Sequence, residues 1–320
     1  MTFSSKVILI TTLLISSICA AQYTDEVNSN RPGKSMMAFA VGKSVIQTET
    51  GVNYITENHD KLNYNAKGYF ADLALRWGLF KEELELIAEI QYQKDSYQKF
   101  DVTSNRSALR QTTFGAKYLI YDPFKKGEDK PNLYSWKANH KFKWKQFIPA
   151  VGVYVGMNFG FANEDYAFPD EPSMSPKVMV IAQNHFGTRW VLVTNIFYDK
   201  FTTDYKSLGY ILTLTRGFNQ KWSGFIENQG IKGDYYSDSI FRIGAAYLIQ
   251  NNLQVDASIS KNFKDTPDIL YGGVGVSWRF DKKYKPVKIE TDEEGGKRVD
   301  KKKKDKKTKE AKKRADEVEG

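Results

Sequence analysis

The sequence contains little cysteine, little histidine and few continuous apolar stretches. Its 320 residues include one cysteine, three histidines and nine prolines. A single thiol excludes a disulfide framework within the chain, and the scattered histidines do not have the spacing of a zinc site. Outside the N-terminus, no run approaches the roughly 20 apolar residues of a membrane-spanning helix. These absences exclude a helical membrane protein, and we expect no metal and no cofactor.

The N-terminus has the pattern of a secretory signal peptide. A lysine precedes a mostly apolar run at 7–18, which is too short to cross a bilayer, and small residues follow it. We predict cleavage before Gln22, so that residues 1–21 are the signal peptide. Lipidation at Cys19 is an alternative, but Ile18 stands where such sites favour a small residue. Export is consistent with a protein of the cell outer membrane.

The C-terminal segment differs in composition from the rest of the chain. Residues 281–320 hold 16 basic residues, 11 acidic residues and one aromatic residue. With almost nothing to pack, this segment is predicted to be a disordered, basic, periplasmic tail. Its lysine run at 301–307 raises the question of nucleic acid, but an exported chain meets little, so none is expected. An anionic surface or a periplasmic protein is the alternative partner.

The body alternates apolar and polar residues, as strands do. Leu84, Leu86 and Ile90 share one face, whereas Glu85 and Glu89 share the other. Segments of this kind, separated by turn residues, are the signature of a membrane β-barrel. The predicted strands are 43–58, 65–77, 82–95, 107–122, 146–161, 175–186, 190–203, 207–216, 221–231, 237–249, 252–264 and 268–280. We therefore predict an all-β, transmembrane antiparallel barrel of about twelve strands at 43–280, preceded by a lead-in or plug at 22–42.

The predicted connections indicate an orientation. Every second connection should be a short periplasmic turn. Four of these are short and contain glycine or asparagine, namely 78–81, 187–189, 217–220 and 250–251. The intervening segments 96–106 and 162–174 are longer and are predicted to be extracellular loops. The connection 123–145 breaks the rule, because it is long, basic and aromatic.

Large aromatic residues gather at the ends of the predicted strands next to the short turns. Aromatic girdles lie where a barrel meets the membrane surface, so a lipid bilayer is an expected partner. Tyr271 to Phe280 also resembles the C-terminal signal read by the barrel-assembly machinery, the partner expected during insertion. The predicted membrane-interface aromatics are Trp77, Trp190, Trp222, Trp278 and Phe280. Trp136 and Trp144 fall in the long connection at 123–145.

The inward faces of the strands carry charges of both signs. They could be paired supports that fill a narrow barrel, or the lining of a solute path. Their mixed signs argue against a strongly ion-selective pore. The lumen-lining candidates are Glu49, Asp72, Arg76, Glu85, Glu89, Lys117, Glu227, Arg242, Asp256 and Arg279.

An enzyme is a remote alternative. Some outer-membrane phospholipase barrels use Ser, His and Asn, and here His185 lies beside Asn184, with Asn195 on the next predicted strand. No serine at a matching depth completes the set. We therefore expect no catalytic residues.

Several segments together resemble one family. Residues 30–35 are similar to its N-terminal Asp-Arg-Pro-Gly element, with asparagine in place of the acid. The segments similar to its strands, in the same order, are 47–51, 75–79 followed by 83–86, 115–118, Glu227 and 273–280. The family is that of small outer-membrane barrels described by the MetA pathway of phenol degradation. The resemblance implies a transporter or channel for small, apolar or aromatic molecules and does not imply catalysis. A structural barrel that docks periplasmic partners through its basic tail is the alternative.

Overall fold

A computed structural model describes residues 27–123, 147–160, 166–167, 170–187 and 189–281. The chain divides into two units, 1–285 and 286–320, and every described residue belongs to the first. The predicted signal peptide, almost all of the 123–145 connection with Trp136 and Trp144, and almost all of the basic tail lie outside the described residues. These assignments stay predictions.

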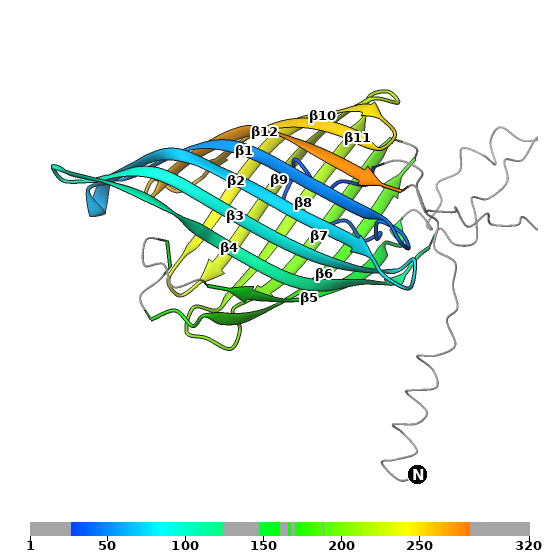
Figure 1. The fold of residues 1–320 in the computed structure, drawn as a ribbon, viewed down its shortest axis with the longest axis horizontal. Coiled ribbons are helices and arrows are strands. Elements are labelled where there is room, and N and C mark those ends of the chain that lie inside the picture. The colour runs from blue at the N-terminus through cyan, green and yellow to red at the C-terminus, as the bar shows by residue number, and fades with distance from the viewer. Residues whose placement is uncertain (1–26, 124–146, 161–165, 168–169, 188, 282–320) are drawn as a thin grey trace, which may run out of the picture. The chain divides into compact units, whose positions relative to one another are not determined.

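Twelve antiparallel strands close into one barrel (Figure 1). Each strand pairs with its neighbours in the sequence, and the last strand pairs with the first. The strands are β1 (Ile46–His59), β2 (Tyr64–Gly78), β3 (Leu84–Lys99), β4 (Val102–Tyr121), β5 (Ala150–Phe159), β6 (Met174–Phe186), β7 (Trp190–Asp199), β8 (Ser207–Gly217), β9 (Trp222–Gly233), β10 (Ser237–Gln250), β11 (Leu253–Asn262) and β12 (Asp268–Phe280). The predicted twelve-stranded antiparallel barrel is confirmed. Among the described residues, no helix has the length and apolar character needed to cross a membrane.

The barrel places apolar side chains outside and charged side chains inside. On β1, Val52 faces outward and is 53% exposed, whereas Glu49 faces inward and is 1% exposed. Successive strand residues point to opposite faces, so one alternating sequence builds both surfaces. An apolar exterior suits a hydrocarbon solvent, in which every backbone polar group must be paired, and closure of the sheet removes the unpaired edges.

The end of the barrel at which β2 leads into β3 is here called the turn end; the opposite end is the loop end. At the turn end β2 leads into β3, β6 into β7, β8 into β9 and β10 into β11, each across five residues or fewer. These short turns were predicted. At the loop end, 14 residues separate β5 from β6.

One predicted loop is wrong. The segment 96–106 is not an extracellular loop, because β3 and β4 continue through it and turn only at Phe100 and Asp101. Cross-strand contacts hold this extension: Arg106 Nε lies 2.8 Å from Asp95 Oδ1 and stacks 4.2 Å above the Tyr97 ring. Strands β1 to β4 consequently project beyond the others at the loop end (Figure 1).

Two belts of aromatic residues surround the outer surface. Trp77, Trp190, Trp222, Trp278 and Phe280 all lie near the turn end and are 38–50% exposed. Toward the loop end, outward-facing tyrosines form the second belt, comprising Tyr54, Tyr69, Tyr92, Tyr198 and Tyr210. On β2, Tyr69 and Trp77 are eight residues apart, or about 27 Å along a strand, and a strand tilted by about 40° then spans about 20 Å of a hydrocarbon layer about 25 Å high. The role of these residues as interface anchors stays a prediction.

Candidate functional site

Residues 27–45, here called the plug, enter the barrel and leave it through the same end. Val27 N donates to Asn251 O in the β10–β11 turn at 2.8 Å, and Ser44 N donates to Gly78 O at the end of β2 at 2.9 Å. Both acceptors lie at the turn end. Between these points the segment is not a strand, so it does not extend β1. Its fully buried members include Ala38, Val41 and Val45.

The tip of the plug is anchored by one carboxylate. Glu227 on β9 accepts the backbone N–H groups of Lys34, at 3.0 and 3.1 Å, and of Ser35, at 3.2 Å. It also accepts a hydrogen bond from the Thr213 hydroxyl at 2.7 Å and forms an ion pair with Arg242. A carboxylate that accepts several N–H donors and a guanidinium is a strong, well-satisfied acceptor. Glu227 therefore ties the plug to the wall formed by β8, β9 and β10.

Arg31 provides the second anchor of the tip. It pairs with Asp72 on β2, and its Nη2 lies 3.2 Å from Asp256 Oδ1 on β11. The guanidinium occupies space that two facing glycines leave open: a Cβ built on Gly51 or on Gly275 would lie 2.2 Å from Arg31 Nη2. These two glycines are direct partners across β1 and β12. The missing side chains thus make room for the ion pair.

Wall side chains satisfy the polar backbone of the returning limb. Asn195 accepts from Met36 N at 2.6 Å and donates to Met36 O at 2.9 Å. Gln183 accepts from Ala38 N at 2.9 Å. Lys117 Nζ lies 2.9 Å or less from the carbonyl oxygens of two further plug residues. A segment outside the sheet must find such partners, because buried N–H and C=O groups are costly when unpaired.

A buried charge network lies between the plug and the turn end. Arg76 Nη1 lies 3.0 Å from Glu49 Oε1, and Arg76 Nη2 lies 3.1 Å from Glu85 Oε1. Lys117 Nζ lies 2.8 Å from the same Glu85 oxygen. All four side chains are at most 1% exposed. Glu85 Oε2 also accepts the backbone N–H of Val41 at 2.8 Å, so the network holds the base of the plug.

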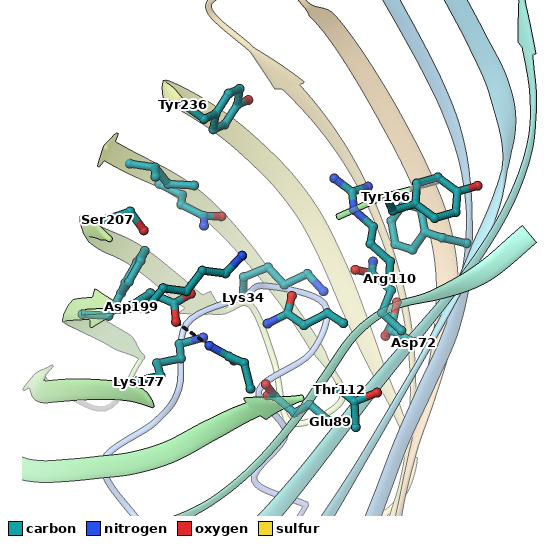
Figure 2. Close-up of a pocket in the computed structure, with 18 of the residues that line it drawn as sticks. Lys34, Asp72, Glu89, Arg110, Thr112, Tyr166, Lys177, Asp199, Ser207 and Tyr236 are labelled. Atoms are coloured by element: carbon teal, nitrogen blue, oxygen red, sulfur yellow. Dashed lines mark hydrogen bonds between the residues drawn. The ribbon is translucent and has the colours of Figure 1, made fainter. Parts of the chain in front are cut away.

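Above the plug, the loop-end half of the barrel encloses a cavity of about 1230 Å³. Arg31, Lys34 and Met36 of the plug line it. Figure 2 shows side chains from the plug, β4 and β6, among them Lys34, Arg110 and Lys177, around this space. Seven basic and seven acidic side chains line the cavity, so their formal charges cancel.

One wall of the cavity is apolar. The plug residue Met36 packs in one buried cluster with Tyr154, Met179, Phe197 and Ile211, which project from β5 to β8. The cavity therefore offers both an apolar wall and a balanced set of charges.

The structure brings most of the ten lumen candidates together. Eight are at most 6% exposed and lie in the ion-paired clusters or next to them, namely Glu49, Arg76, Glu85, Lys117, Glu227, Arg242, Asp256 and Arg279. Arg279 Nε lies 3.5 Å from Asp281, near the turn end. Asp72 and Glu89 are less buried and line the cavity. Their part in a solute path stays a prediction.

Sequence reasoning missed the residues that hold the plug. Arg31 was not among the candidates, because no strand pattern covers it. Asn195 was considered only as a catalytic partner, and Gln183 was not considered. The sequence does contain a signal for Arg31. The ten candidates comprise six acids and four bases, and because buried acids need partners, a cation outside the strands is required.

The residues considered for the remote enzyme alternative form hydrogen bonds with other groups in the barrel. The Asn195 side chain is bonded to Met36, and the His185 ring lies 2.8 Å from the Gln183 amide nitrogen. Asn184 donates to Phe147 O at 3.1 Å. Across the described ranges, no group of three or more His, Cys, Asp or Glu side chains is placed to hold a metal ion.

Adding one methyl group at Gly51 is expected to loosen the plug. Gly51→Ala displaces the Arg31 guanidinium from its position between Asp72 and Asp256 without removing any charge. A nitroxide on Lys34→Cys should then give an electron paramagnetic resonance spectrum with a new mobile component. The label is specific when the protein is produced as residues 22–320, because this segment contains no other cysteine.

Gly217→Ala is the matched control. A Cβ at this position meets only Arg189 O at 3.9 Å, so the spectrum should not change. Identical spectra for Gly51→Ala and the parent would show that Arg31 does not restrain the tip.

Comparison with solved structures identifies the fold. The outer-membrane channel COG4313 from Pseudomonas putida F1 is 12% identical, with a TM-score of 0.54 over 80% of this chain and 100% of that chain. The translocator domain of the autotransporter NalP from Neisseria meningitidis is also 12% identical, with a TM-score of 0.44 over 75% of this chain and 89% of that chain. The sequence has no significant match among curated proteins.

A family model matches residues 29–280, which include the plug from its third residue and the whole barrel. The resemblance noted at 30–35, 47–51, 75–86 and 273–280 lies within this range. The chain belongs to the family described as "Putative MetA-pathway of phenol degradation".

Proposed function

We propose that this protein is an outer-membrane channel for small solutes and that the plug closes it. One observation carries the proposal: a cavity of about 1230 Å³ fills the loop-end half of the barrel and ends on the plug. A barrel wide enough to hold a cavity of this size can hold a small ligand or a path for one. The plug is anchored by polar contacts rather than by strand pairing, so it can leave without opening the sheet.

The outer surface supports the membrane location. Apolar side chains face outward between the two aromatic belts, and the charged side chains face the lumen. This is the pattern of an outer-membrane barrel and the reverse of a water-soluble one. Family membership and the similarity in fold to an outer-membrane channel are consistent with it.

The lining favours solutes without net charge. Opposite charges balance around the cavity, so neither cations nor anions gain a strong advantage. The apolar wall around Met179 and Phe197 supports a solute with an apolar face, and the family description supports a phenolic or other aromatic compound. This solute class is part of the proposal.

Flux through the purified protein tests the proposal. The mature chain, residues 22–320, and the tail-truncated chain, residues 22–280, are reconstituted into liposomes, and swelling is followed with neutral solutes of increasing size. We expect little swelling with either chain, because both keep the plug, and swelling that falls off with solute size once residues 28–41 are deleted. The proposal would fail if folded protein gave no flux with the plug present and none with the plug deleted.

A second candidate is a barrel without transport that docks a periplasmic partner through residues 281–320. The observation that favours it is the firmness of the plug, which two ion-paired clusters and one buried network hold in place. Lack of flux in every variant, together with loss of a partner on removal of the tail, would support this candidate instead.

A further inference from the structure

Five tyrosines line the cavity at the loop end. Tyr64 begins β2, Tyr166 lies in the β5–β6 connection, Tyr205 in the β7–β8 connection, and Tyr235 and Tyr236 in the β9–β10 connection. We call this set the tyrosine collar. Since all these connections lie at the same end of the barrel, the collar belongs to the part of the cavity that a solute from the loop end meets first.

Two rings of the collar each have a cation over one face. Arg106 lies 4.8 Å from the centre of the Tyr166 ring, and Lys264 lies 5.6 Å from the centre of the Tyr236 ring. Neither cation lines the cavity, whereas both tyrosines do. The cations therefore cover the ring faces that point away from the cavity. Figure 2 shows Tyr166 and Tyr236 on different walls.

Two hydroxyl groups of the collar donate hydrogen bonds to carboxylates. Tyr64 Oη donates to Glu57, which also lines the cavity, and Tyr236 Oη donates to Asp238 Oδ2 at 2.6 Å. Burial raises the pKa of Tyr236, and Asp238 raises it further, so the phenol keeps its proton. A phenol that donates its proton to a carboxylate leaves its oxygen lone pairs to accept. The collar thus offers flat apolar faces beside hydrogen-bond acceptors.

Donors line the same cavity. Lys34, Arg110 and Lys177 line it, and cations of this kind donate hydrogen bonds and accept none. A ligand in this cavity therefore meets both acceptors and donors. Hydroxyl groups match both, because each can donate and accept.

Three classes of ligand can be weighed against this lining. A charged ligand gains little, because the charges of the lining cancel. A pure hydrocarbon would cover polar groups without bonding to them, which costs free energy. A hydroxylated saturated ring fits both features, since its C–H faces carry partial positive charge that suits the negative face of an aromatic ring, and its hydroxyls reach the polar groups.

We propose that the tyrosine collar is a binding site for neutral cyclic sugars. The proposal rests on the proposed function only in placing the collar at the entrance of a channel. Binding itself requires the collar alone. It can therefore be measured separately from flux.

Saturation-transfer difference NMR on the folded mature chain tests the site. The protein is held in a detergent without a sugar headgroup, and the probes are glucose, maltose, the acyclic polyol mannitol, and phenol. We expect saturation of the ring protons of glucose and maltose, and none or far less on mannitol. Signal on phenol without signal on the sugars would overturn the proposal in favour of an aromatic ligand. No signal on any probe would also overturn the proposal, because the tyrosines would then have only a structural role.

Variants then assign the binding to the collar. Tyr64→Leu and Tyr236→Leu should each raise the dissociation constant for maltose about three- to tenfold, the range expected for loss of one aromatic contact. Tyr236→Phe keeps the ring but removes the hydroxyl acceptor, so it should weaken binding less than Tyr236→Leu does. Tyr54→Leu, which changes an outward-facing tyrosine that is 44% exposed, should have no effect.

Folding and flux are read separately. Heat-modifiable mobility shows that each variant is folded, and liposome swelling reports transport. Sugar binding that is lost equally in Tyr54→Leu and in the collar variants would overturn the site. Sugar binding without flux of any neutral solute, even after deletion of residues 28–41, would contradict the channel function while supporting the collar.

Discussion

A mature chain that lacks residues 28–41 is expected to conduct ions in a planar bilayer with a steady current about tenfold or more above that of the full chain. The deletion removes both limbs of the plug and joins the cavity to the turn end. The wall loses no ion pair of its own, because Arg242 still pairs with Glu227, and Arg76 still pairs with Glu49 and Glu85. The barrel should therefore stay folded while its lumen opens.

The control for this deletion is removal of the basic tail. Residues 282–320 lie outside the barrel strands, so their loss should leave the single-channel current of the full chain unchanged. If the plug deletion and the parent gave the same current, closure would have to lie elsewhere than at residues 28–41, and the proposed role of the plug would be wrong.

Arg76→Met is expected to cost the most stability of any single change in the barrel wall, about 3–5 kcal/mol. Arg76 is fully buried between Glu49 and Glu85, which are 1% and 0% exposed. Methionine fills a similar volume but leaves Glu49 without its cation in a site closed to water. Lys117 remains beside Glu85. The midpoint of urea unfolding in micelles and the temperature at which heat-modifiable mobility is lost both measure this effect.

Two further variants identify the cause. Arg216→Met removes an exposed arginine that lies 4.9 Å from the centre of the Trp190 ring, and it should cost about 1 kcal/mol or less. Arg76→Met with Glu49→Gln should regain part of the loss, because the second change removes the unpaired charge. Equal costs for Arg76→Met and Arg216→Met would contradict a stabilising role for the buried network.

Local patterning is the reason that so much of the fold could be predicted. A strand alternates its faces every residue, and the bilayer requires one face to be apolar, so twelve alternating segments predict twelve strands without knowledge of the partners. The same argument assigns Glu49, Arg76 and Glu85 to the inner face. It failed at 96–106, because a hairpin that extends beyond the membrane has polar residues on both faces and reads as a loop.

The plug shows where local patterning ends. Residues 27–45 make almost no regular structure, so their path depends on contacts with residues that are distant in the sequence. Arg31 meets Asp256, 225 residues away, and Lys34 meets Glu227, 193 residues away. The surplus of acids over bases among the inward-facing candidates shows that cations are missing, but not which ones.

The sequence by itself determined the strand order, the inside and outside faces, the short turns and the position of the aromatic residues at the turn end. Each of these follows from period-two alternation and turn chemistry within a few residues. Only the tertiary structure decided that the N-terminal segment folds back into the lumen, that Gly51 and Gly275 make room for Arg31, and that five tyrosines line the cavity at the loop end. These features arise because barrel closure brings β1 against β12 and gathers separate connections at one rim, where the partner of each residue is set by three-dimensional position rather than by its neighbours in the chain.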